Sequence, residues 1–203
     1  GRHLPALQAV ASKYENIALQ QCDVTDYAAM QQSVNAAMQH FGVTDIVIAN
    51  AGAAESVPFS KMTPEDWSHS IDVNLGGVFN SFKACMPHME ASGWGRMISI
   101  ASTAGLKGYP YVAQYCAAKH GVIGLTRALS QELAKTGITV NAICPGFTET
   151  PMLERSLENI QSKTGMSREE AAKALTRTNP MGRFIQPQEI AQTVLWLIGE
   201  RSD

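Results

Sequence analysis

The chain has 203 residues, of which 45% are hydrophobic and 17% are charged, and its formal net charge is −2. These values are typical of a globular protein with one domain or two. The nearly neutral charge offers no basic surface to nucleic acid or to an anionic membrane, so we expect a small-molecule partner.

The four cysteines and five histidines are scattered along the chain. The cysteines form no CxxC pair, and the histidines show no HExxH or similar spacing of metal ligands. We therefore expect free, buried thiols in a reducing compartment and no metal site. The sequence shows no secretory signal and no apolar run long enough to cross a membrane, which predicts a cytoplasmic protein without a membrane span.

The spacing of apolar residues predicts helices that alternate with strands. The predicted helices are residues 4–14, 25–41, 63–89, 115–136, 151–163, 167–177 and 187–199. The predicted strands are residues 17–22, 45–49, 97–101 and 138–144, and the second of them is apolar enough to be buried. This alternation is the pattern of βαβ units, so the sequence predicts an α/β fold with a doubly wound parallel sheet.

Residues 147–186 interrupt the alternation with two short helices. The second of these begins with a capping box, in which Ser167 precedes Glu170 by three residues. The segment follows the last predicted strand, beside the edge where the strands end. This is a suitable place for a lid or a substrate lobe, so we expect one domain over residues 1–203 with a small lobe at 147–186.

Polar or flexible residues follow three of the predicted strands. Asn50-Ala51-Gly52 follows residues 45–49, Ser102 follows 97–101, and Pro145-Gly146 follows 138–144. In parallel α/β sheets the ligand crevice lies at the carboxyl ends of the strands, where these residues would meet. A glycine such as Gly52 permits close approach of a ligand to the backbone, although a tight turn explains it equally well.

Tyr115 and Lys119 are four residues apart in a segment of helical pattern, so they lie on the same helix face. An adjacent ammonium favours the phenolate and lowers the pKa of a tyrosine, which is normally about 10. Such a tyrosine could exchange a proton with a substrate hydroxyl or carbonyl. Most pairs of this kind are surface packing, and the strand-end Ser102 is what favours the catalytic interpretation here.

Five features occur in order along the chain, and together they resemble the short-chain dehydrogenase/reductase family over nearly all of its length. They are Asn50-Ala51-Gly52, Asn74 in DVNLGGVF, Ser102, Tyr115-Cys-Ala-Ala-Lys119, and Pro145-Gly146 with Thr148 and Thr150. The resemblance implies a Rossmann-like fold and reversible NAD(P)-dependent hydride transfer between an alcohol and a ketone.

The resemblance also assigns roles to four residues. Tyr115 would donate a proton to the carbonyl oxygen, and Ser102 would position that oxygen. Lys119 would lower the tyrosine pKa and hold the nicotinamide ribose. Asn74, which is unusual inside a helix, would hold a water molecule of a proton relay.

By the same resemblance a second set of residues would bind the cofactor. Asn50, Ala51 and Gly52 would line it, Asp23 and Val24 would flank the adenine, and Pro145, Gly146, Thr148 and Thr150 would lie on the carboxamide side, together with Tyr115 and Lys119.

The choice between NADP and NAD depends on the start of the chain. Gly1 stands where relatives that prefer NAD have an acidic residue, and Arg2 offers planar charged donors that suit a 2′-phosphate. We expect NADP, with NAD as the alternative if Arg2 is only a solvated residue at the start of a helix.

Three segments look most like 3-oxoacyl thioester reductases and 3-hydroxyacyl-CoA dehydrogenases, namely CPGFTETPM, SREEAAKAL and NPMGRFIQPQEIA. The alternatives are a reductase of a sugar, cyclic or steroid carbonyl, and a dinucleotide-binding regulatory protein without turnover. Relatives are commonly homotetramers or homodimers, and we expect the same here through helices 63–89 and 115–135. The resemblance further implies that the first βαβ portion, with its Gly-rich phosphate-binding turn, and the last strand lie outside these 203 residues.

Overall fold

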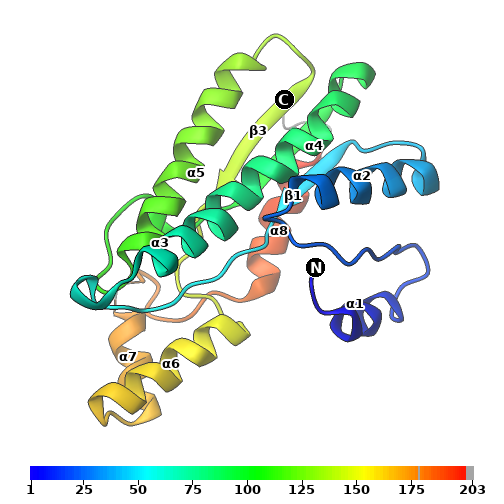
Figure 1. Ribbon diagram of the computed structural model, residues 1–203. Coiled ribbons are helices and arrows are strands. Elements are labelled where there is room, and N and C mark those ends of the chain that lie inside the picture. The colour runs from blue at the N-terminus through cyan, green and yellow to red at the C-terminus, as the bar shows by residue number, and fades with distance from the viewer. Residues whose placement is uncertain (178, 200–203) are drawn as a thin grey trace.

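The fold is that of a computed structural model, which describes residues 1–177 and 179–199. A parallel sheet of three strands lies at the centre (Figure 1). The strands are β1 (Ile46–Ala49), β2 (Gly95–Ile100) and β3 (Ile138–Ile143), with β2 in the middle. All three run in the same direction, so their carboxyl ends lie at one edge of the sheet.

Helices cover both faces of this sheet, which is therefore doubly wound as predicted. The helices α4 and α5 lie side by side across one face, and α8 lies behind the sheet in the view of Figure 1. The helix bounds are α1 Leu4–Ala11, α2 Tyr27–Phe41, α3 Pro64–Ile71, α4 Gly77–Ser92, α5 Ala113–Glu132, α6 Pro151–Thr164, α7 Arg168–Thr176 and α8 Pro187–Leu197.

The main hydrophobic core fills the space between the sheet and helices α4 and α5. Met89 of α4, Met97 of β2 and Val122 of α5 are completely buried in it. Phe82 of α4 and Val140 of β3 belong to the same cluster. Burial of these side chains fixes α4 and α5 against the sheet, and α5 carries Tyr115 and Lys119.

The helix predicted at residues 63–89 is continuous but contains one wide turn. Thr63 caps α3 in a reciprocal capping box with Asp66. Between α3 and α4 the residues Asp72–Gly76 form a π-helical turn, which contains Asn74. π turns inside α-helices are frequent at functional sites.

The strand predicted at residues 17–22 is wrong. The segment is extended, and its backbone bonds are isolated contacts with Gly1: the Cys22 N–H donates to the Gly1 carbonyl, and the Gly1 amine donates to Gln20. A strand requires a continuous ladder with a neighbouring strand, and this segment has no such neighbour among the described residues.

The expected burial of residues 45–49 is also partly wrong. Ile46 and Ile48 are 37% and 45% exposed, whereas Ala49 is buried. The reason is that β1 is an edge strand with α4 packed on one face, while α8 on the other face contacts β3.

Residues 147–186 form a lobe with its own small apolar cluster. Leu153 and Leu157 of α6 pack there with Ala171 of α7. An ion pair of 2.6 Å between Arg168 and Glu154 also joins the two helices. At the base of the lobe Thr148 pairs with Ile185 in a parallel bridge, so the chain enters and leaves the lobe at the same place.

Candidate active site

The segments that follow the three strands meet at one edge of the sheet. The Ala101 N–H donates to the Ile143 carbonyl over 2.8 Å, and the Thr103 N–H donates to the Pro145 carbonyl over 2.9 Å. The continuation of β2 is thereby bonded to the continuation of β3. The predicted crevice residues therefore lie together at the carboxyl edge, as in other α/β proteins.

Ser102 directly precedes a 3-10 turn, Thr103–Gly105, as its N-cap. Its backbone is extended, and its Oγ accepts a hydrogen bond of 3.0 Å from the Ala104 N–H. The turn lies directly on α5, because a Cβ added to Gly105 would be 2.7 Å from the Lys119 carbonyl oxygen. This close approach brings the Ser102 hydroxyl to Tyr115, with which it shares a side-chain hydrogen bond.

Burial determines the protonation of Tyr115. It raises the pKa of the phenol above its usual value of about 10, while the hydrogen bond with Ser102 acts in the opposite direction. The Lys119 Nζ lies 5.6 Å from the centroid of the tyrosine ring. Loss of water around the phenol is the largest effect on its pKa in the chain alone, and the lowering of this pKa by Lys119 stays a prediction.

Lys119 is 3% exposed, and its Nζ donates to the Ile100 carbonyl over 2.9 Å. Burial lowers the pKa of this amine to about 8. The nearby thiol of Cys144 has a raised pKa, also because of burial. Lys119 is thus fixed beneath the end of β2, and its amine can change between the charged and the neutral form near physiological pH.

The side chain of Asn74 joins the π turn to the segment after Gly52. Its Oδ1 accepts from the Ala53 N–H over 3.0 Å, and its Nδ2 donates to the Ala53 carbonyl over 2.8 Å and to the Ser70 carbonyl over 2.9 Å. The unfavourable asparagine inside a helix therefore holds a loop in place. The role of Asn74 in binding a relay water stays a prediction.

The backbone at Gly52 fits the approach of a cofactor to Lys119. A Cβ at Gly52 would lie 3.0 Å from Asn74 Oδ1 and 3.8 Å from Lys119 Nζ, so any larger residue would fill this space. Asn50 and Ala51, which precede it, are exposed at the end of β1. Gly52 therefore leaves space beside the buried lysine, and the binding of a cofactor by residues 50–52 stays a prediction.

Asp23 and Val24, the two residues predicted to flank the adenine, are held by hydrogen bonds to different partners. The carboxylate of Asp23 accepts from the Thr25 N–H and hydroxyl over 2.9 and 2.8 Å, and these bonds hold its pKa below the usual range. The Val24 carbonyl accepts from Asn80 Nδ2 over 2.8 Å. Asn80 was missed by the sequence reasoning, although it carries the same signal as Asn74, an asparagine inside an apolar helix.

Arg2 lies beside Asp23 on the surface, with 3.5 Å between Arg2 Nη1 and Asp23 Oδ2. Its side chain is 68% exposed. The exposed guanidinium can therefore change its position. Its contact with Asp23 does not place Arg2 next to the residues around Lys119.

The segment after β3 is held mainly by its own hydroxyl groups. The Thr148 hydroxyl donates to the Gly146 carbonyl over 3.0 Å, and the Thr150 hydroxyl donates to the Thr148 carbonyl over 3.2 Å. A Cβ on Gly146 would meet Asn179 Oδ1 at 2.6 Å, so this glycine permits the lobe to lie close to the strand end. Asn179 is a second residue that the sequence reasoning missed.

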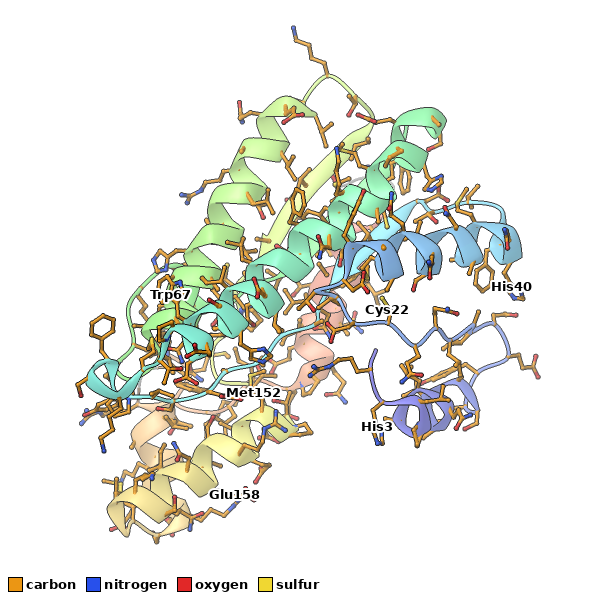
Figure 2. All side chains as sticks on the ribbon, in the orientation of Figure 1. His3, Cys22, His40, Trp67, Met152 and Glu158 are labelled. Carbon is orange, nitrogen blue, oxygen red and sulfur yellow. The ribbon has the colours of Figure 1, made fainter. Side chains whose placement is uncertain are left out.

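The described residues contain no group of three or more His, Cys, Asp or Glu side chains that could hold a metal ion. His3, Cys22 and His40 illustrate this, since Figure 2 shows them on separate parts of the N-terminal region. All four cysteines are free, with Cys85 and Cys116 buried and the other two half-buried. None of the described helices is both long enough and apolar enough to span a membrane.

The fold and the strand-end residues define a class of dinucleotide-dependent oxidoreductases. Residues 1–161 match the family model of the short chain dehydrogenases, and the chain belongs to this family.

Three similar proteins illustrate the likeness. The chain is 37% identical over 180 residues to the 3-oxoacyl-[acyl-carrier-protein] reductase of Thermotoga maritima, covering 89% of this chain and 69% of that protein. It is 38% identical over 178 residues to the acetoacetyl-CoA reductase of Rhizobium meliloti, covering 88% and 70%. A crystal structure of a variant of the actinorhodin polyketide ketoreductase with NADPH superposes with a TM-score of 0.93, at 36% identity, covering 99% of this chain and 79% of that one.

Proposed function

We propose that the chain is an NADP-dependent oxidoreductase that interconverts 3-oxoacyl and 3-hydroxyacyl thioesters. The observation that carries this proposal is the meeting of Ser102, Tyr115 and Lys119 at the carboxyl edge of the sheet. The narrower substrate class is supported by the two relatives, whose names give 3-oxoacyl-[acyl-carrier-protein] and acetoacetyl-CoA as substrates.

In the proposed reduction, the residues of this chain supply the proton and orient the substrate. Tyr115 carries its proton at neutral pH, since its pKa lies above the usual phenol value of about 10, and this proton is available to the carbonyl oxygen. Ser102, already hydrogen-bonded to Tyr115, positions the same oxygen. The nicotinamide cofactor supplies the hydride when it is bound.

Lys119 and Asn74 organise the surroundings of this pair. The Lys119 amine, whose pKa is about 8, can hold a hydroxyl group of the cofactor ribose and accept or release a proton near neutral pH. Asn74 fixes the loop at Ala53, directly after Gly52. We assign Asn50, Ala51, Gly52, Pro145, Gly146, Thr148 and Thr150 to the walls of the cofactor site.

A turnover assay with the purified protein tests the substrate class. We expect NADPH to be oxidised with acetoacetyl-CoA or a 3-oxoacyl thioester, at a higher kcat/KM than with sugar, cyclic or steroid ketones. Faster turnover of a sugar, cyclic or steroid ketone would assign that ketone, in place of the thioester, as the substrate class. Absence of turnover with every carbonyl, combined with tight cofactor binding, would favour a regulatory dinucleotide-binding protein instead.

The preference for NADP is tested at Arg2. Its exposed guanidinium lies beside Asp23, the residue assigned to the adenine end, and can turn toward a 2′-phosphate. We expect Arg2→Ala to weaken NADP(H) binding at least roughly tenfold and NAD(H) binding much less, while Lys13→Ala on the same surface serves as a control. Equal losses for both cofactors would show that Arg2 does not contact the phosphate.

We also propose a single Rossmann-like domain with a substrate lobe at 147–186, a cytoplasmic location, and a homodimer or homotetramer. The separate apolar cluster of α6 and α7 and the parallel bridge at its base support the lobe. Exposed aromatic residues on α3 and α4 support the oligomer. The small residues of α5 support it less than expected, because Ala118 is buried and Gly121 packs on Leu75 of the same chain.

A further inference from the structure

A buried amide lies directly before the proposed proton donor. Gln114, the residue preceding Tyr115 on α5, is 2% exposed. Its Nε2 donates to the Glu55 carbonyl over 2.9 Å, whereas its buried Oε1 has no hydrogen-bond partner among the described residues. A backbone carbonyl only accepts hydrogen bonds, so the nitrogen of the amide must face Glu55 and the oxygen must face elsewhere.

Gln114 lines a small polar cavity of about 10 Å³. This is about the volume that a single water molecule needs, provided that it finds two to four polar partners. The Ser70 hydroxyl and the Asp66 carboxylate offer such partners. The cavity is lined by Ala53, Glu55, Asp66, His69, Ser70 and Gln114.

The cavity lies where three elements that carry site residues meet. Ala53 and Glu55 belong to the loop after Gly52, Ser70 belongs to α3, and Gln114 belongs to the first turn of α5. The carbonyl of Ser70 accepts from Asn74 Nδ2, which also donates to the Ala53 carbonyl. A ligand in the cavity would therefore contact the supports of Gly52, Asn74 and Tyr115 at once.

We propose that this cavity binds one water molecule, which donates a hydrogen bond to Gln114 Oε1, and that Gln114 is a positioning residue for Tyr115. A buried carbonyl oxygen without a partner is costly, and the water removes this cost. The bond from Gln114 to Glu55 then fixes the start of α5 relative to the cofactor-side loop. This role rests on the proposed function, whereas the water site does not.

A second bond shows that the two segments are aligned over several residues. The Val57 N–H donates to the Tyr111 carbonyl over 2.8 Å, and Tyr111 has a positive φ of 67°. A non-glycine residue in this conformation is strained and needs support from its surroundings. The bond from Gln114 to Glu55 joins the same two segments closer to Tyr115 along the chain.

Replacement by leucine tests the positioning role. Gln114→Leu keeps the approximate size of the side chain and removes both polar groups, and we expect kcat to fall roughly tenfold to a hundredfold because the proton donor is misplaced. The KM for the ketone and the Kd for NADPH should change less than about threefold. Gln131→Leu, on the exposed end of α5, is the matched control, and an equal kcat in both variants would overturn the role of Gln114.

Replacement by glutamate separates positioning from a general loss of folding. In Gln114→Glu an ionised carboxylate cannot donate to the Glu55 carbonyl, but a protonated one can. Glu55 and Asp66 raise the pKa of the new carboxyl, and a protonated His69 opposes them. The kcat of this variant, relative to wild type, should therefore rise as the pH falls, whereas Gln131→Glu should follow the wild type. A constant ratio for Gln114→Glu would contradict the proposal.

A high-resolution crystal structure tests the water independently of turnover. We expect one ordered water within hydrogen-bond distance of Gln114 Oε1 in the wild-type protein, and its loss in Gln114→Leu. A dry cavity would overturn the site even in an active enzyme. An ordered water in a protein that turns over no carbonyl would retain the site and reject the proposed function.

Discussion

At the scale of single residues, burial controls the two proposed proton-transfer groups in the same sense. It raises the pKa of Tyr115 and lowers the pKa of Lys119 to about 8, so it shifts both equilibria toward the neutral form, while Lys119 stays mostly protonated at pH 7. A neutral phenol is the acid that a ketone reduction needs. The sequence reasoning placed the two residues correctly on one helix, but it weighed their charges and could not weigh their burial.

Tyr115→Phe removes the phenolic proton and leaves the ring in place. We expect turnover to fall by roughly 10²–10⁴-fold, which is the usual contribution of a positioned acid, with little change in cofactor binding. Steady-state kinetics and a fluorescence titration with NADPH measure the two effects. Tyr14→Phe is the control, because Tyr14 is exposed and distant from Tyr115 in the sequence. A rate above about a tenth of wild type for Tyr115→Phe would exclude Tyr115 as the proton donor.

The lowered pKa of Lys119 predicts a pH dependence of stability. Between about pH 8 and the usual lysine value of 10.5 the unfolded chain binds more protons than the folded one at this residue, so its contribution to the free energy of unfolding rises with pH. In Lys119→Met this rise is lost. The stability of the wild type relative to Lys119→Met should therefore increase over this range by an amount on the order of 3 kcal/mol.

Denaturant unfolding of both proteins at a series of pH values measures this difference. Titrating groups far from Lys119 cancel in the comparison because the two proteins share them, whereas the coupled thiol of Cys144 needs a second comparison in a Cys144→Ala background. A difference that stays constant from about pH 7 to about pH 10.5 would show that the ammonium of Lys119 is not desolvated in the fold.

At the scale of elements, caps and periodicity identified the helices well. Thr63 with Asp66 and Ser167 with Glu170 form the capping boxes, and the bounds of α6 and α7 lie close to those predicted. Local patterns are sufficient here because a helix makes its hydrogen bonds within itself. The strand at residues 17–22 failed because a strand needs a neighbour that is distant in sequence.

Apart from Tyr115 and Lys119, which their helical spacing identified, the candidate site residues were recognisable where a side chain has an unusual local position. Ser102 at the end of a strand and Asn74 inside a helix both carry such a signal. Gln114 carries none, because a glutamine in the first turn of a helix is ordinary and only the fold shows that Glu55 lies opposite. The π turn at Asp72–Gly76 was likewise hidden, since its sequence continues the helical pattern.

The contact between the 3-10 turn and α5 depends on Gly105. Gly105→Ala places a methyl group 2.7 Å from the Lys119 carbonyl oxygen, a backbone atom that cannot move away easily. We expect a loss of about 1–3 kcal/mol in the free energy of unfolding, and a lower kcat because Ser102 moves away from Tyr115. Denaturant unfolding and kinetics on the same sample measure both.

Gly124→Ala is the matched control on α5. Nothing lies within 4 Å of a Cβ at this position, so the substitution should stabilise the helix by about 0.5–1 kcal/mol. Similar stability of the two variants would show that the turn does not approach α5 as closely as described.

At the scale of the whole molecule, two aromatic side chains on α3 and α4 are exposed. Trp67 of α3, labelled in Figure 2, is 42% exposed, and Phe79 of α4 is 51% exposed. Exposed aromatic residues on adjacent elements are typical of protein interfaces. They favour the proposed assembly through α3, α4 and α5 over a monomer.

Phe79→Glu tests that assembly. A carboxylate placed in a buried apolar interface loses its water and gains no partner, so we expect the oligomer to dissociate at micromolar concentration. Light scattering coupled to size exclusion measures the mass of each species. Phe41→Glu is the matched control, because Phe41 is 50% exposed at the end of α2, outside the proposed interface, and should leave the mass unchanged. A wild-type protein that is already monomeric at this concentration, or dissociation caused equally by both substitutions, would refute an interface through α3, α4 and α5.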